Sequence, residues 1–68
     1  MAMSRNYYVI KEGGQWKVKL ERGRVISTHR TQKAAKREAK RLGRNNGRGV
    51  TVNAAEGYTR YSIGKDEL

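Results

Sequence analysis

The segment TQKAAKREAKRLGRNN, residues 31–46, decides the fold that we predict for this chain of 68 residues. Its apolar residues recur at helical spacing, because Ala35, Ala39 and Leu42 are separated by four and then three positions. Thr31 is a suitable N-cap, since its hydroxyl can accept a hydrogen bond from a backbone amide two or three residues later. We therefore expect an amphipathic helix whose inner face consists mostly of small residues.

The end of this helix has two candidates. Gly43 could supply a left-handed cap directly after Leu42, or the helix could continue to Asn46 and be capped by Gly47. We favour the longer helix, because it keeps Arg44 on the same side as the other basic residues.

The outer side of the predicted helix is almost entirely basic, and Glu38 is the only acid in the segment. At about 100° per residue, half of the helical wheel collects Lys33, Lys36, Arg37, Lys40, Arg41 and Arg44. Like charges three and four residues apart repel each other, so this pattern is typical of a surface that meets a counter-charge. The alternative is an ordinary solvated helix face.

Short strands are expected on both sides of the helix. Residues 7–10 are aromatic and β-branched, the pair Gly13-Gly14 predicts a tight turn, and residues 16–20 alternate between apolar side chains and lysine. Together they predict a β-hairpin with one buried face. Further strand candidates are residues 25–26, 50–52 and 58–63.

The element order ββ(β)αββ predicts an α+β fold, an antiparallel sheet of three to five short strands with one helix packed on one face. We expect a single domain over residues 1–68, with an ordered core from about residue 6 to residue 63. Trp16 is the residue that we expect at the centre of the core. The other bulky core candidates are Val9, Val18, Leu20, Leu42, Val50 and Val52.

From residue 7 to about residue 61 the chain resembles DUF2188, a family of short prokaryotic domains. The resemblance rests on a Tyr-x-Val strand, a glycine-rich turn before Trp-x-Val-Lys, an alanine-rich helix opened by threonine, a Val-x-Val strand and a later glycine. The residues that carry it are Tyr7, Val9, Trp16, Val18, Lys19, Thr31, Ala35, Ala39, Val50, Val52 and Gly57. It implies a small α+β domain that pairs into dimers or occurs in tandem, without a catalytic motif. Two features depart from the pattern: Gln15 precedes the tryptophan where glycine is expected, and the chain is more basic.

The chain carries 16 Lys and Arg against six Asp and Glu, a formal charge of +10. Self-repulsion of this size would be relieved by a polyanion. There is no cysteine, which excludes disulfides and thiolate metal sites. Dimerisation is the remaining common support for so small a domain.

Enzymatic activity is not expected. His29 is the only histidine, and no acid lies near it in the sequence to form a catalytic pair. The glutamates lack metal-ligand spacing, and no phosphate-cradling glycine loop is present. We expect no cofactor, no metal and no small-molecule substrate.

The basic residues favour a nucleic-acid partner, DNA or RNA, bound mainly through phosphates and with low sequence specificity. Besides the helix, we expect contributions from Arg48 in the following loop and from Lys17 and Lys19 on the sheet face away from the helix. Arg48 could instead belong to a simple helix cap and turn. The runner-up function is a small dimeric adaptor that binds an acidic protein. A membrane partner is disfavoured, because the apolar helix face is mostly alanine.

Tyr8 and Ile10 are expected on the same outer sheet face as the two lysines. Tyrosine beside lysine could stack nucleobases, as in proteins that bind single strands. We favour the other interpretation, in which Tyr8 and Ile10 form the interface of a homodimer.

The location that we expect is cytoplasmic, with association with the nucleoid or the ribosome as a further option. The apolar run at residues 7–10 is too short for a signal-peptide core or a membrane span. The final residues KDEL spell an endoplasmic-reticulum retention signal. We interpret this match as coincidental, because nothing in the sequence directs the chain into the secretory pathway.

Overall fold

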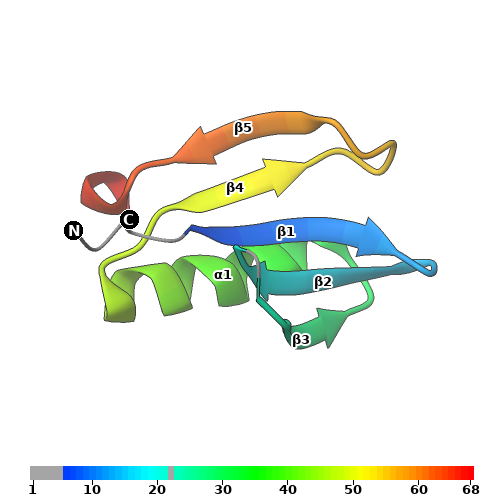
Figure 1. Ribbon diagram of the computed structural model, residues 1–68, viewed down its shortest axis with the longest axis horizontal. Helices are drawn as coiled ribbons and strands as arrows, with labels where there is room; N and C mark the ends of the chain where they lie inside the picture. The colour runs from blue at the N-terminus through cyan, green and yellow to red at the C-terminus, as the bar shows by residue number, and fades with distance from the viewer. Residues whose placement is uncertain (1–5, 22) are drawn as a thin grey trace.

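The computed structural model describes residues 6–21 and 23–68. Within these ranges five strands form one sheet, and a single α-helix, α1, passes behind β1 and β2 in Figure 1. The α+β class and the order of the elements are as predicted. The elements are β1 (Tyr7–Glu12), β2 (Gln15–Leu20), β3 (Val25–His29), α1 (Gln32–Asn46), β4 (Val50–Asn53), β5 (Thr59–Ile63) and the 3-10 helix η1 (Lys65–Glu67).

The sheet is mixed, with the strand order β3-β2-β1-β4-β5. β1 and β4 pair in parallel at its centre, where Tyr7 lies opposite Val50 and Val9 opposite Val52. All other neighbours are antiparallel. The predicted purely antiparallel sheet is therefore wrong at its central pair. The reason is the connection: α1 carries the chain from β3 back across the sheet, so that β4 runs in the same direction as β1.

The β1–β2 hairpin is closed by the two glycines that the sequence analysis singled out. Gly13 and Gly14 have φ angles of 61° and 78°, the combination that a tight two-residue turn between antiparallel strands requires. Glu12 and Gln15 form the last pair of the ladder. Gln15 is thus accommodated as a strand residue, and its departure from the family pattern does not disturb the turn.

The helix follows the longer of the two predicted versions. The hydroxyl of Thr31 accepts a hydrogen bond from the amide of Ala34 at 3.1 Å, which caps the first turn. At the other end α1 reaches Asn46, and Gly47 adopts the left-handed conformation with φ at 65°. The amide of Gly47 donates to the carbonyl of Gly43.

The core is built from small and β-branched residues. The largest fully buried side chains are those of Val9, Val18, Val50 and Val52, against which α1 places Ala35 and Ala39. Tyr7 is also buried, and its hydroxyl accepts a hydrogen bond from Asn46 Nδ2 at 3.0 Å.

Trp16 does not occupy the centre of the core, so that prediction is wrong. It is half-buried and packs against the edge of the core, as Leu20 and Leu42 do. Its ladder partners are Lys11 and His29, near the hairpin end of the sheet. The short alanine side chains bring α1 close to the middle of the sheet, where the buried sheet side chains are valines rather than an indole.

Gly43 is tightly packed against residues outside α1. A Cβ atom at this position would lie 2.5 Å from the carbonyl oxygen of Arg48 and 2.8 Å from Cδ1 of Leu68. Leu68 follows η1 and packs against the core, so the KDEL residues are folded onto the domain. Gly43 is therefore a packing residue rather than the helix cap.

Replacing Gly43 by Ala is expected to lower the free energy of unfolding by about 1–3 kcal/mol, because the added methyl group overpacks the contact with Arg48 and Leu68. Helix propensity alone would change stability in the opposite direction, by about 1 kcal/mol. Urea denaturation followed by circular dichroism measures the difference. Asn45→Ala, at an exposed position on the same helix, is the control. A Gly43→Ala variant as stable as the wild type would contradict the close packing.

Candidate nucleic-acid interface

Five of the six predicted basic residues of α1 share the side of the helix that faces away from the sheet, and Lys36 lies at the border of that side. Because Ala35, Ala39 and Gly43 are buried against the sheet, the opposite side of α1 is turned to solvent. We call this surface the basic helix face. Its exposed members are Lys33, Arg37, Arg41 and Arg44, and its half-buried members are Lys36 and Lys40.

Lys36 marks the border of the basic helix face towards β5. Its Nζ lies 5.4 Å from the centre of the Tyr61 ring, a cation–π contact between the helix and the sheet. This contact places the ammonium group of Lys36 beside the ring of Tyr61 and explains why both side chains are half-buried.

Glu38 is paired with Arg41 through two hydrogen bonds. Arg41 Nη2 donates to Oε2 at 2.7 Å, and Nε donates to Oε1 at 3.1 Å. The hydrogen bond from Arg41 lowers the pKa of Glu38 and raises the pKa of Arg41. In the described part of the chain, no other basic residue of α1 forms an ion pair. The helix therefore presents a surplus of uncompensated positive charge.

A notch between β3 and α1 extends this surface to one side. It is lined by His29 of β3 together with Ala34, Arg37, Glu38 and Arg41 of the helix. His29 Nε2 lies 2.9 Å from the hydroxyl of Ser27, which holds the imidazole ring along the strand. The structure thus brings an acid near His29 that the sequence could not place there, but that acid is already bound to Arg41.

Arg48 belongs to the cap and turn that follow α1. Its amide donates to the carbonyl of Gly43 at 2.9 Å, and its side chain is half-buried. Asn46 donates from its side chain to Tyr7 and to the carbonyl of Leu42. Residues 44–46 therefore belong to the helix, and Arg48 lies beyond the end of the basic helix face.

Lys17 and Lys19 lie on the sheet face that α1 does not cover, as the alternation of β2 predicted. Lys19 pairs with Tyr8 across the ladder, and Lys17 pairs with Ile10. We call this surface the open sheet face. The nine basic residues named from the sequence consequently occupy two opposite sides of the domain and the end of the helix.

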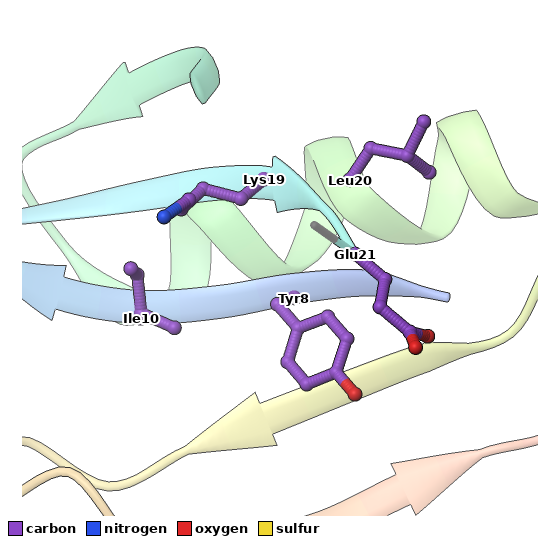
Figure 2. Close-up of a pocket in the computed structure, with 5 residues that line it drawn as sticks. All are labelled: Tyr8, Ile10, Lys19, Leu20 and Glu21. Carbon is purple, nitrogen blue, oxygen red and sulfur yellow. The ribbon is translucent and has the colours of Figure 1, made fainter. Parts of the chain in front are cut away.

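The open sheet face combines apolar side chains with charges of both signs. Figure 2 shows Tyr8, Ile10 and Lys19 beside Glu21, around a shallow depression of about 210 Å³ that Leu20 also lines. Lys17 Nζ lies 3.1 Å from Glu12 Oε1. Two lysines and two glutamates therefore surround Tyr8 and Ile10. Sequence reasoning missed Glu21, which follows β2 and is held by a hydrogen bond from its amide to the carbonyl of Asn6.

Two kinds of site receive no support from the described residues. No helix in the described ranges is long and apolar enough to cross a membrane. Among residues 6–21 and 23–68, no group of three or more His, Asp or Glu side chains could hold a metal ion.

The fold and these two surfaces define a small α+β domain with a cationic helix on one side and an uncovered sheet on the other. The chain belongs to the DUF2188 family, described as an uncharacterized protein conserved in bacteria, whose profile matches residues 7–58. No curated protein matches the chain. No solved structure matches it.

Replacing Arg41 by Gln is expected to raise the pKa of Glu38, because the carboxylate then loses the hydrogen bond that stabilises its ionised form. The pKa should return towards the ordinary value for glutamate, and an NMR titration of the side-chain carboxyl group measures it. Arg37→Gln removes a neighbouring charge without removing this hydrogen bond and should leave the pKa of Glu38 much less changed. Equal effects of the two substitutions would contradict the specific pair.

Proposed function

We propose that the chain binds nucleic acid through the basic helix face, with contacts to phosphates rather than to base edges. The observation that supports this most directly is the surplus charge of α1. Five cations point away from the sheet, Lys36 lies at the border beside Tyr61, and the only acid of the helix is paired with Arg41. Such a surface attracts polyanions and releases their counterions on binding.

The dimensions of the basic helix face suit a phosphate backbone. With a rise of about 1.5 Å per residue, Lys33 and Arg44 are separated by about 16 Å along α1. Cations four residues apart are separated by about 6 Å, while each strand of duplex DNA advances about 3.4 Å per phosphate. Several side chains of one helix can therefore contact phosphates of the same nucleic acid.

Two of the three amide side chains of α1 are already engaged, which supports low sequence specificity. Gln32 donates to the carbonyl of Asn53 and accepts a hydrogen bond from Arg60. Asn46 is bonded to Tyr7 and to the carbonyl of Leu42. Asparagine and glutamine are the side chains best suited to adenine, so the engagement of Gln32 and Asn46 leaves Asn45, near the exposed end of the helix, as the amide of α1 that can reach a base edge.

A second part of the proposal concerns the open sheet face, which we assign to a homodimer interface around Tyr8 and Ile10. In a symmetric dimer the same patch meets itself, so a patch with charges of both signs can be self-complementary. Lys17 and Lys19 of one copy can meet Glu12 and Glu21 of the other. Burying Tyr8 and Ile10 also adds apolar contact to a domain whose core is small.

Reversing two charges of the basic helix face tests the nucleic-acid proposal. In Arg37→Glu/Lys40→Glu we expect an affinity loss of tenfold or more for duplex DNA near physiological salt, together with a shallower dependence of log K on log salt. The matched control is Lys11→Glu/Arg24→Glu, which changes the net charge equally at exposed positions outside both surfaces. Fluorescence anisotropy with duplex DNA, single-stranded DNA and duplex RNA across a salt series measures these differences.

Equal losses in the two double variants would mean that only the total charge matters and would contradict the helix as the contact surface. Binding that disappears by about 0.1 M salt, together with tight binding of a folded acidic protein, would favour the adaptor function instead.

Replacing Ile10 by Lys tests the dimer. We expect this variant to be a monomer, because it replaces an apolar contact by an additional positive charge from each copy where the two copies meet. Analytical ultracentrifugation at matched protein concentrations measures the mass. Tyr58→Lys introduces the same charge in the turn between β4 and β5, where Tyr58 is 65% exposed, and should leave the dimer intact. Loss of the dimer in both variants would contradict Ile10 as a specific part of the interface.

A further inference from the structure

We infer that the protein acts as a bridge that holds two separate nucleic-acid duplexes together. This inference rests on the proposed function, both the nucleic-acid contact and the homodimer. It goes beyond them, because neither the nucleic-acid contact nor the dimer alone determines how many duplexes one homodimer binds.

The inference begins with the positions of the two surfaces. The basic helix face and the open sheet face lie on opposite sides of the same sheet, since α1 packs on the face formed by Val9, Val18, Val50 and Val52. Tyr8 and Ile10 project from the other face. The surface that pairs the copies is thus directed away from the surface that binds phosphates.

Pairing two copies through their open sheet faces produces four layers, in the order helix, sheet, sheet, helix. Face-to-face sheets pack about 10 Å apart, and a twofold axis relates the copies. The two basic helix faces then form the outermost surfaces and are directed away from each other.

A single duplex cannot reach both outer surfaces without bending sharply around the particle. Duplex DNA has a persistence length of about 150 base pairs, and bending a site of 20–30 base pairs by 40–90° already costs about 1–6 kcal/mol. Reversing direction over a comparable length would cost considerably more. Binding a second duplex to the second helix avoids this cost.

The distribution of aromatic residues favours a duplex over a single strand, which could wrap around the particle. Single strands are held by bases stacked on aromatic side chains. All aromatic residues of the chain are described by the structure, and α1 carries none of them. Tyr61 lies under Lys36, while Tyr7, Tyr8, Trp16 and Tyr58 belong to the sheet or its turns.

A two-duplex capture experiment tests the inference. A biotinylated duplex of about 30 base pairs is fixed on streptavidin beads, and a fluorescent blunt duplex without complementary ends is added with the protein. We expect the protein to retain the fluorescent duplex, with a maximum at intermediate protein concentration. At excess protein, each duplex is covered by its own dimers, so that fewer dimers link two duplexes and less fluorescent duplex is captured. Raising the salt concentration should release the captured duplex.

Two variants separate bridging from binding. Ile10→Lys should still bind one duplex by anisotropy but capture at least tenfold less of the second duplex. Arg37→Glu/Lys40→Glu should lose both binding and capture, while Tyr58→Lys should retain both.

The outcomes distinguish the inference from the function on which it rests. A wild-type dimer that binds duplex without capturing a second one overturns the bridge and leaves the nucleic-acid proposal standing. Undiminished capture by Ile10→Lys, or capture that rises with protein without a maximum, also overturns the bridge. If the wild type binds no duplex, the proposed function fails and the inference fails with it.

Discussion

The close contact between the small-residue face of α1 and the valines of the sheet is the constraint on which the rest of the structure depends. Ala35, Ala39 and Gly43 let the helix approach until Val9 and Val52 are completely buried. A helix with only this narrow stripe inside must turn its long side chains outward. The same contact that completes the core therefore also gathers the cations on one surface.

Features set by local sequence were the ones that could be predicted. The turn at Gly13 and Gly14, the cap at Thr31 and the helix end at Gly47 each depend on residues close together in the chain. The parallel pairing of β1 with β4 could not be predicted, because the alternation of apolar and polar residues does not indicate whether two strands pair in parallel or antiparallel. Trp16 was misplaced for a related reason: its size indicates burial, but its position depends on how closely the helix approaches.

The candidate site divides in the same way. Helical periodicity alone was sufficient to place Lys33, Arg37 and the rest of the basic helix face on one side of α1. The surroundings of that face depend on tertiary contacts. His29 and Arg37 line the same notch because β3 lies beside the helix. Glu21 and Tyr8 line the same depression because the chain turns after β2. The spacing of residues in the sequence does not indicate that these side chains are neighbours.

The central position of the parallel β1–β4 ladder has a consequence for the order in which the domain forms. Three of the four strand pairings join strands that are close in sequence. The fourth pairs β1 with β4, in which Tyr7 lies opposite Val50, and joins strands that are far apart in sequence. During synthesis, β1 therefore emerges with one hydrogen-bonding edge paired to β2 and the other edge unoccupied until α1 and β4 have followed. Such an edge is a template for intermolecular pairing. The nascent chain is most prone to aggregation after the β1–β2 hairpin has formed and before α1 and β4 have been synthesised.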